Sequence, residues 1–585
     1  MREKILILGA ETTQAVAIAR SLGTRGYDVY VASSSRNSIA NFSKFVKGSF
    51  LYSSPIESPY FFVKDLLKIL SLHNFDLLIC THETNIIPIM FYREDVEKLT
   101  NLPLPPNKVL MKVFNKKEVT ELAKKLRIPI PKTYFIENED EVEELAKEMI
   151  YPVVIKPQFT AYWDGKSRTM SRGKAKIAKN SYEFSEIVKE LKQGDYFPLV
   201  QELIPELGSG GIGISTLIDK HQNLKAIFLH RRLKEVDVQG GASAVCESIP
   251  IIDELKNQTL KILRELNFWG VSMTEFKNDP RDNTPKLMEI NGRFWGSLPL
   301  AIYCGVDFPA LFVELMLGKT QSTSDSYAIG ERMRHSTSYT SRLINVIFDQ
   351  IPVWLRPHIS KYQEVKDYCK YTITSRDYIF SFNDPLPYII DWVNFLIKLC
   401  NSVMKKFRNS VIQISILKNC NDRISELLKP RVCILFVCKG NICRSPFAEY
   451  YLKKLIKKYD VHGLEVYSAG LNRIEGRMPP ENAIKAAIRF SVDISRHRSR
   501  AISKELLKKS DIIFVMDVYE YNYIIKNFPE VSKKIFMLGC FNSKLNPQIP
   551  DPYGKNTLDF IKCYNIISTS IDKFFMKIEL KRKKA

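Results

Sequence analysis

The chain lacks several patterns that would assign it to a common class of protein. Its 585 residues contain no low-complexity tract, and its eleven cysteines form no Cys-x-x-Cys pair of the kind that binds zinc. Its first residues do not resemble a signal peptide. Scattered, unpaired cysteines are typical of a reducing compartment, so we expect a cytoplasmic protein.

The sequence also lacks an uninterrupted apolar run of transmembrane length. The best candidate, residues 388–399, is broken by Asp391, Asn394 and Lys398. This segment is amphipathic and precedes a basic run at 405–408. It therefore either packs against a neighbouring domain or makes peripheral contact with an anionic membrane.

Positive charge is abundant, because the formal net charge is +22. This excess favours acidic partners such as nucleotides, anionic lipids or nucleic acid. Nucleic-acid binding would predict basic clusters interleaved with aromatic residues, and only residues 388–408 approach that pattern. We expect no nucleic-acid partner, and we expect the basic tail, 578–585, to be a solvated end.

The length predicts three to five domains. Residues 1–105 alternate strand and helix patterns in a Rossmann-like order, beginning with an apolar strand at 4–8. The turn after this strand starts at Gly9 but lacks the G-x-G-x-x-G spacing, which argues against a nicotinamide site. Another apolar strand, 76–80, is followed by a polar loop, 81–85, where crevices often form.

Acidic side chains gather on a predicted hairpin further along the chain. Alternation places Glu275 on one face of the first strand, and Glu289 with Asn291 on the same face of the second. Taken singly, each acid could be a solvated strand residue. Together, two carboxylates and an amide oxygen favour Mg²⁺ bridging to nucleotide phosphates.

Residues 1–318 resemble an ATP-grasp protein, with a Rossmann-like first domain at 1–105 and an α+β ATP-grasp domain at 106–318. Such enzymes activate a carboxylate as an acyl phosphate and join it to an amine or a thiol. The resemblance implies ATP and Mg²⁺ as cofactors and small carboxylate and amine substrates, which stay unidentified. It also implies phosphate contacts by Lys116 and Lys156, an adenine contact at Glu202, phosphate or substrate binding by Arg293, and metal binding by Glu275, Glu289 and Asn291.

Residues 319–429 are read as a helical connector of unknown role. The region after it, 430–577, begins with an apolar strand ending at Cys438, a loop containing Asn441, and a helical pattern that starts just after Arg444. Loop N–H groups and the positive end of the helix dipole would converge on a phosphate and stabilise a thiolate. We expect the pKa of Cys438 to lie below its ordinary value, although an ordinary buried cysteine is the alternative.

The remaining strands of 430–577 predict a parallel, doubly wound sheet with the site at its carboxyl edge. A phosphatase that uses a cysteine also needs a group that donates and then accepts a proton. Asp551, held between two prolines, fits this role, although a simple turn residue is the alternative.

Residues 430–577 resemble the low-molecular-weight protein tyrosine phosphatases. The matching motifs are a cysteine and an arginine separated by five residues, Ser468 to Gly470, His497 to Arg500, and Asp551-Pro-Tyr553. The resemblance implies that Cys438, Arg444 and Asp551 are catalytic, that Tyr553 forms a wall of the substrate site, and that no cofactor is needed. It also implies a phosphate-binding loop made of Lys439, Gly440, Asn441, Ile442, Cys443 and Ser445.

Departures from the family pattern refine the predicted substrate. Gly554 replaces a second aromatic, as in bacterial members linked to tyrosine kinases of polysaccharide export. Ile442 occupies a slot where relatives that hydrolyse phosphoarginine carry threonine, which favours a phosphotyrosine protein. Cys443 is close enough in sequence to Cys438 for a reversible protective disulfide.

We therefore predict an α/β multidomain, bifunctional enzyme: a cysteine-dependent tyrosine phosphatase fused to an ATP- and Mg²⁺-dependent ligase. The alternative is that one half only binds its ligand, for example an ATP-grasp half that senses nucleotide. The sequence of the metal-binding triad and the cysteine loop favours catalysis in both halves.

Overall fold

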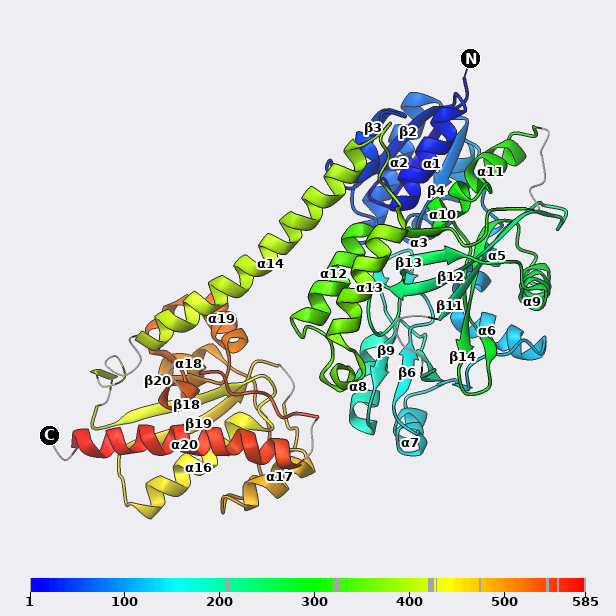
Figure 1. Ribbon diagram of the computed structural model, residues 1–585. Coiled ribbons are helices and arrows are strands. Elements are labelled where there is room, and N and C mark those ends of the chain that lie inside the picture. The colour runs from blue at the N-terminus through cyan, green and yellow to red at the C-terminus, as the bar shows by residue number, and fades with distance from the viewer. Residues whose placement is uncertain are drawn as a thin grey trace. The chain divides into compact units, whose positions relative to one another are not determined.

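The computed structural model describes residues 2–205, 210–319, 326–418, 424, 426–427, 429–472, 475–542, 547–554 and 557–582. The chain forms two compact units, residues 1–397 and 398–585 (Figure 1). Among the described residues, no helix is long and apolar enough to cross a membrane. Parts of the predicted connector and the last three residues of the basic tail lie outside the described residues.

The first unit opens with a parallel sheet in the order β3-β2-β1-β4. Its elements are β1 (Lys4–Leu8), α1 (Thr13–Thr24), β2 (Asp28–Ser33), β3 (Val46–Leu51), α2 (Pro59–His73) and β4 (Leu77–Cys80). This is the predicted Rossmann-like arrangement. The predicted polar loop at 81–85 is instead the start of a helix, α3 (Glu83–Phe91).

The rest of this unit, which the sequence predicts to be an ATP-grasp domain, contains a small sheet with the order β5-β10-β6-β9 and a large sheet with the order β15-β14-β11-β12-β13-β16-β17. The small sheet comprises β5 (Thr133–Tyr134), β6 (Val153–Lys156), β9 (Lys176–Ala178) and β10 (Leu199–Glu202), with α7 (Asp140–Glu148) and α8 (Ser181–Leu191). The large sheet comprises β11 (Gly211–Ile218), β12 (Leu224–Glu235), β13 (Ser243–Ser248), β14 (Gly270–Asp279), β15 (Thr284–Asn291), β16 (Arg332–Arg334) and β17 (Arg376–Asp377).

The two short strands β16 and β17 lie in the region that the sequence assigned to a connector. In the structure they extend the large sheet, because β16 pairs with β13 and β17 pairs with β16. The helices α12 (Ser336–Ile347) and α13 (Lys361–Thr374) contact this edge. Strands of two or three residues are too short to show a two-residue hydrophobic period, which explains why the sequence did not reveal them.

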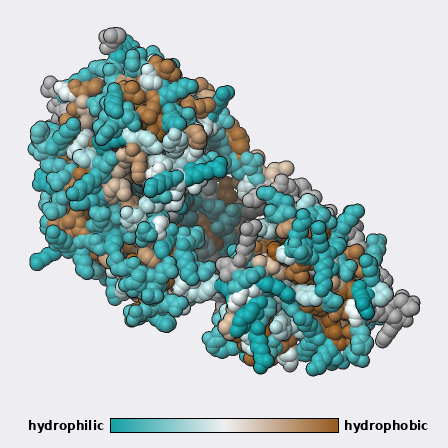
Figure 2. Space-filling view, turned by 180° about the vertical axis from the view of Figure 1, so that it is seen from behind, coloured by the Kyte–Doolittle hydropathy of each residue, from teal (hydrophilic) through white to brown (hydrophobic). Residues whose placement is uncertain are grey.

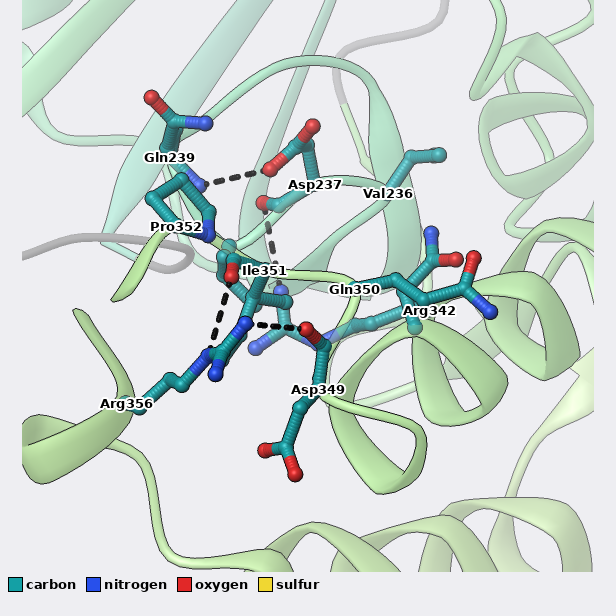
Figure 3. A pocket seen from close by; sticks show the side chains of 11 residues that line it. Val236, Asp237, Gln239, Arg342, Asp349, Gln350, Ile351, Pro352 and Arg356 are labelled. Carbon is teal, nitrogen blue, oxygen red and sulfur yellow. Dashed lines mark hydrogen bonds between the residues drawn. The ribbon is translucent and has the colours of Figure 1, made fainter. Parts of the chain in front are cut away.

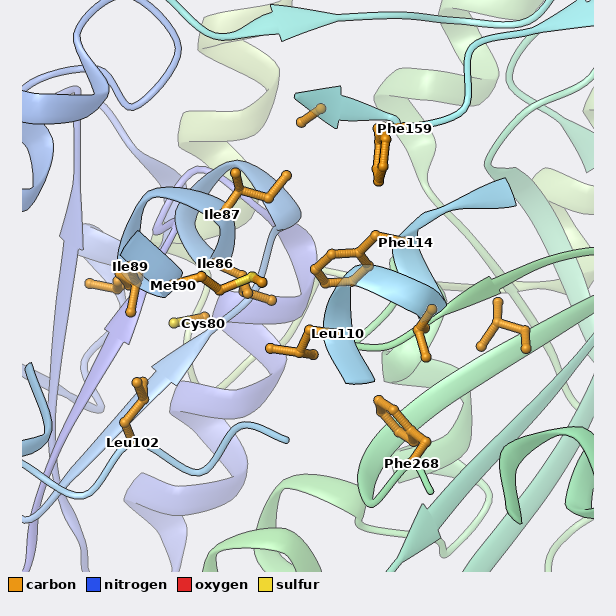
Figure 4. Packing of buried hydrophobic residues seen from close by; sticks show 14 of the residues in the cluster. Cys80, Ile86, Ile87, Ile89, Met90, Leu102, Leu110, Phe114, Phe159 and Phe268 are labelled. Atoms are coloured by element: carbon orange, nitrogen blue, oxygen red, sulfur yellow. The ribbon is translucent and has the colours of Figure 1, made fainter. Parts of the chain in front are cut away.

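A shared hydrophobic core joins the Rossmann-like sheet to the ATP-grasp part. Figure 4 shows Ile86 and Met90 of α3 near Leu110 and Phe114 of α5 (Asn107–Phe114), with Phe159 also in the cluster. All of these side chains are buried. This packing places α6 (Lys116–Lys125), which begins directly after α5, near the metal-binding residues predicted on β15.

The second unit is built on a four-stranded parallel sheet with the order β19-β18-β20-β21. Its elements are β18 (Val432–Cys438), α16 (Arg444–Lys458), β19 (Leu464–Gly470), α17 (Glu481–Ile488), α18 (Lys504–Lys509), β20 (Ile512–Val515), α19 (Val518–Asn527), β21 (Ile535–Met537) and α20 (Thr557–Arg582). The predicted doubly wound sheet is confirmed. The predicted basic tail is partly helical, because α20 includes the buried residue Ile578 and ends at Arg582.

The surface seen in Figure 2 is mostly hydrophilic, and its hydrophobic residues form separate patches. One helix, α14 (Leu386–Lys418), carries exposed apolar side chains at Ile389, Val393 and Leu396. Within the first unit, Asn394 of this helix donates to the backbone oxygen of Asn37.

Candidate functional site

The loop between β18 and α16 surrounds the sulfur of Cys438. Every residue of β18 is buried, and α16 begins at Arg444. Asn441 has a φ of +51°, in the left-handed region that asparagine tolerates better than most residues. The Cys438 Sγ accepts hydrogen bonds from the Asn441 N–H at 3.2 Å and from the Ser445 Oγ at 3.0 Å. The loop is therefore shaped to hold a sulfur anion.

A set of buried polar side chains fixes this loop. The Asn441 Nδ2 donates to Ser445 Oγ and to Ser468 Oγ, at 3.0 and 2.9 Å. The Asn441 Oδ1 accepts from the Arg500 N–H at 2.9 Å, and the His497 ring nitrogen lies 2.9 Å from the Asn441 backbone oxygen. Sequence motifs drew attention to these positions but assigned them no role; the structure shows that they support Asn441.

Arg444 has a buried side chain surrounded by acceptors. Its Nη1 donates to Asp517 at 3.0 Å and to the backbone oxygen of Ile549 at 3.1 Å. Its Nη2 donates to Glu520 at 3.1 Å and to Asp551 at 2.8 Å. The structure thus brings Arg444 and Asp551, predicted from separate motifs, into direct contact. The sequence interpretation did not find Glu520.

The charge balance around Cys438 differs from the sequence expectation. Burial raises the pKa of the Cys438 thiol and the Glu520 carboxylate raises it further, while Arg444 and Ser445 lower it without reversing the shift. The expected lowering of this pKa is therefore not found in the structure. The main physical reason is that the thiol is buried, and Arg444, which opposes this effect, also pairs with Asp517, Glu520 and Asp551.

The other predicted residues of the loop lie around the sulfur. Ile442 and Cys443 are buried, whereas Lys439 is exposed. The Tyr564 hydroxyl of α20 donates to the Cys443 backbone oxygen at 3.3 Å, which ties the loop to that helix. Their backbone N–H groups are the parts of these residues that could contact a phosphate.

Tyr553 lies beside the loop that carries Asp551. Its backbone N–H donates to Asp551 Oδ1 at 3.3 Å, and its hydroxyl accepts from Arg477 Nη2 at 2.7 Å. The Arg477 guanidinium also lies 5.9 Å from the centre of the Tyr553 ring. A rim made of an aromatic ring and a cation therefore borders this part of the second unit, where the sequence suggested one aromatic wall.

The first unit brings the predicted metal ligands together. Glu275 on β14 is paired directly with Glu289 on β15. The Asn291 Nδ2 donates to Glu275 Oε1 at 3.1 Å. Two carboxylates and an amide oxygen are ligands that suit Mg²⁺ when substrate phosphates and water complete its shell. The donor set therefore fits the magnesium ion that the sequence suggested.

Two predicted lysines flank these acids. Lys116 Nζ lies 3.6 Å from a Glu289 oxygen and donates to Thr160 Oγ1 at 2.9 Å. Burial lowers the pKa of Lys156 to about 8, although Glu289 opposes this shift. Burial would raise the pKa of Glu289, but Lys116 and Lys156 outweigh it and hold that pKa below its ordinary value. The lysines and the acid form one electrostatic cluster.

The structure separates Glu202 from this cluster. Glu202 lies at the end of β10, opposite Val153, whereas Lys156 pairs with Leu199 three residues away. The Glu202 carboxylate forms ion pairs with Arg281 at 2.7 Å and Lys286 at 3.2 Å. The Glu202 side chain therefore holds the hairpin formed by β14 and β15. The adenine contact at Glu202 stays a prediction.

Arg293 joins the metal-binding residues to the Rossmann-like sheet. Its Nη2 donates to Asn291 Oδ1 at 3.0 Å, and its Nε lies 3.5 Å from Glu83 at the start of α3. Sequence reasoning missed Arg232, whose Nη2 lies 2.6 Å from Glu275 and whose Nη1 lies 3.5 Å from Glu235. A pair of arginines just after the apolar run of a strand is the sequence signal that could have identified it.

A polar pocket of about 430 Å³ lies below the loop that follows β12 (Figure 3). Gln239 of this loop and Arg356 lie on its wall, together with Asn345 and Gln350. Arg342 donates to the backbone oxygen of Glu235 at 2.8 Å, which holds the loop in place. The side chain of Glu235, which precedes the pocket residues of this loop, pairs with Arg232, and Arg232 pairs with the predicted metal ligand Glu275.

Comparison with known proteins divides the chain in the same way. The family model for low molecular weight phosphotyrosine protein phosphatases matches residues 433–585. The low molecular weight protein-tyrosine-phosphatase Ptp of Acinetobacter johnsonii is 36% identical over 138 residues, which are 24% of this chain and 92% of Ptp. The solved structure of the YwlE arginine phosphatase from Geobacillus stearothermophilus is 29% identical, covers 26% of this chain and 96% of its own, and has a TM-score of 0.24.

The first unit matches a different family. The model described as ATP-grasp in the biosynthetic pathway with Ter operon covers residues 223–338. The structure of N5-carboxyaminoimidazole synthetase from Staphylococcus aureus is 15% identical, covers 57% of this chain and 82% of its own, and has a TM-score of 0.43.

Proposed function

Because residues 433–585 belong to the low molecular weight phosphotyrosine protein phosphatase family and are fused to an ATP-grasp domain, we propose that Cys438 is the nucleophile of a metal-independent phosphatase. The main support is the cradle of the Cys438 sulfur, which receives two hydrogen bonds from its own loop. Arg444 and Asp551 complete the site through their 2.8 Å contact.

The reaction proceeds in two displacements. The Cys438 thiolate attacks phosphorus, an S–P bond forms, and the bond to the leaving oxygen breaks as Asp551 gives that oxygen its proton. Asp551, now a carboxylate, then takes a proton from water as the water oxygen attacks phosphorus. Inorganic phosphate leaves and the thiolate is restored. Arg444 and the loop N–H groups stabilise the charge on the phosphoryl oxygens.

Hydrolysis of p-nitrophenyl phosphate in the presence of EDTA tests this assignment. The unchanged chain should be active, and Cys438→Ser should abolish the activity with the fold intact. Retention of activity by Cys438→Ser would refute the proposal. Asp551→Asn should slow hydrolysis without loss of phosphate binding.

The proposed substrate is a phosphotyrosine protein, such as a bacterial tyrosine kinase of polysaccharide export. Ile442 and Tyr553 support an aryl phosphate, since both place apolar surface beside the loop. A phosphotyrosine peptide and a phosphoarginine peptide of the same sequence distinguish this from arginine phosphatase activity. A preference for phosphoarginine would refute the substrate assignment, and replacement of Ile442 by Thr should weaken the preference for phosphotyrosine.

For the first unit we propose an ATP-dependent ligase that joins a small carboxylate to an amine or a thiol. Glu275, Glu289 and Asn291 would hold Mg²⁺, which when bound neutralises nucleotide phosphates during transfer. Lys116 and Lys156 supply positive charge beside the same acids. The polar pocket below the β12–β13 loop, with Arg356 on its wall, is the proposed place for an organic substrate.

The test is a screen for release of ADP that requires both Mg²⁺ and one added carboxylate. The activity should disappear in Glu289→Ala, whereas Glu254→Ala, an exposed acid of α9 (Asp253–Glu265), should keep it. The alternative, a domain that only senses nucleotide, predicts ATP binding that Glu289→Ala weakens but no release of ADP with any carboxylate.

A further inference from the structure

One buried carboxylate beside the phosphatase loop has no part in the two displacements described above. Glu520, in the first turn of α19, has a fully buried side chain. One of its oxygens accepts from Arg444 Nη2 at 3.1 Å, and the other accepts from the Met516 N–H at 2.8 Å. Glutamate is almost never fully buried unless it is paired, so its fixed contact with Arg444 calls for a physical explanation.

The hydrogen bonds of Arg444 show which donors remain for a substrate. Both terminal nitrogens are occupied, Nη1 by Asp517 and a backbone oxygen, and Nη2 by Glu520 and Asp551. The Arg444 Nε is buried and has no acceptor among the described residues. A phosphoryl group can use an arginine side-on, through Nε and the adjacent terminal nitrogen, so one hydrogen on Nη2 must become free.

The two carboxylates on Nη2 differ in their ability to leave. The Asp551 side chain is 40% exposed and can turn away from Arg444 into solvent, whereas the Glu520 side chain is completely buried. We propose that Glu520 is a positioning residue that holds Arg444 Nη2 in place, so that Nε and Nη2 stay available to the phosphoryl oxygens when Asp551 leaves. This inference rests on the phosphatase function proposed above.

The charge of Glu520 has a second consequence for the nucleophile. Four ionisable groups lie around Glu520. They are Arg444 of α16, Asp517 at the start of α19, Asp551 of the loop before α20, and Cys438 at the end of β18. Burial raises the pKa of Glu520 to about 8. An ionised Glu520 opposes a thiolate at Cys438, so a neutral residue that keeps the hydrogen bond should lower the pKa of Cys438.

Three variants of the full chain separate these effects. Glu520→Ala removes the charge and both accepted hydrogen bonds, whereas Glu520→Gln removes the charge but keeps one oxygen that can accept from Arg444 Nη2 in place of the two acceptors of the carboxylate. Glu530→Gln is the matched control, because Glu530 is partly exposed and its nearest cation is Lys504 at 3.8 Å. The measurements are hydrolysis of p-nitrophenyl phosphate, competitive inhibition by inorganic phosphate, and the rates at which iodoacetate and iodoacetamide alkylate Cys438.

Glu520→Ala should weaken phosphate inhibition and lower kcat/KM by about 10- to 100-fold, the effect expected from loss of a charged hydrogen bond. It should also lower the ratio of iodoacetate to iodoacetamide rates, because only the iodoacetate anion is recruited by Arg444. Glu520→Gln should keep this ratio and move the pH dependence of alkylation to lower pH. Glu530→Gln should match the unchanged chain in every assay.

Unchanged phosphate inhibition and an unchanged alkylation ratio in Glu520→Ala would overturn the proposal. If Glu520→Ala loses cooperative unfolding, Glu520→Gln decides, because its amide oxygen can still accept from Arg444 Nη2: retained phosphate inhibition and a retained alkylation ratio support the positioning role, and loss of both contradicts it. Failure of the phosphatase assignment is distinguishable, because the unchanged chain would then not hydrolyse p-nitrophenyl phosphate at all.

Discussion

Asp551 and Arg444 form an ion pair across the mouth of the phosphatase loop, with 2.8 Å between Asp551 Oδ2 and Arg444 Nη2. The proposed proton donor, Asp551, is therefore paired with the same arginine that would bind the phosphoryl group of the substrate. In the proposed mechanism, a bound phosphate would take the place of Asp551 on Arg444, and Asp551, freed from this ion pair and protonated, would then serve as the acid.

Asp551→Asn removes the proton donor but keeps a similar shape. We expect kcat for a phosphotyrosine peptide to fall about 10²- to 10⁴-fold. The loss for p-nitrophenyl phosphate should be smaller, because nitrophenolate leaves without a proton. Steady-state kinetics with both substrates measure the difference, and an equal loss for the two would contradict the role of Asp551 as an acid.

Gly470→Ala should distort the phosphate loop. A Cβ at this position would lie 3.0 Å from the Asn441 Cβ and 3.0 Å from the Gly440 carbonyl carbon. Such overpacking destabilises by about 1–3 kcal/mol, and here the strain falls on the cysteine loop. We expect a lower kcat/KM and a lower Tm of the second unit. Gly296→Ala is the control, because its Cβ would meet no atom within 4 Å.

ATP affinity of the first unit should decline as the pH rises through about 8. Burial lowers the pKa of Lys156 to about 8, so the lysine is charged below this pH and neutral above it, where it loses its attraction for phosphate. Titration calorimetry with ATP and Mg²⁺ between pH 6.5 and 9.5 measures this effect. Lys156→Arg should flatten the profile, because arginine stays charged over the whole range.

Oxidation should inactivate the phosphatase reversibly if Cys443 protects the nucleophile. Both cysteines are buried and unbridged in the structure. After exposure to peroxide, the unchanged chain should recover with dithiothreitol, whereas Cys443→Ser should recover less because Cys438 proceeds to the sulfinic acid. Equal recovery of the two proteins would refute the protective role, and Cys369→Ser, at an exposed cysteine of the first unit, is the control.

The exposed apolar side of α14 should bind anionic vesicles if the predicted membrane contact exists. Val393 is 42% exposed and lies between Ile389 and Leu396 on the same face of the helix. Sedimentation with phosphatidylserine vesicles at low salt should show binding that Val393→Asp weakens. Ile373→Asp, at an exposed isoleucine of α13, should leave it unchanged. Absence of binding by the unchanged chain would exclude the lipid contact.

The sequence by itself determined the parts of the sites that are contiguous in the chain. Cys438 to Arg444 form one strand–loop–helix segment, and Glu289 to Arg293 lie on one strand and the turn after it, so local periodicity predicted both. The sequence also predicted the parallel sheet of the second unit, because its buried strands are continuous apolar runs.

Only the tertiary structure decided which distant residues meet these segments. Arg232 reaches Glu275 through the register of β11, β12 and β14, and Glu520 reaches Arg444 because α19 packs beside the loop. The strands β16 and β17 form by pairing onto the edge of the large sheet at β13. Two or three residues are too few to show the hydrophobic alternation that predicts a strand. Local sequence patterns specify the secondary structure and the kinds of side chain that each segment carries. The neighbours of a buried charge depend instead on packing between segments that are far apart in sequence.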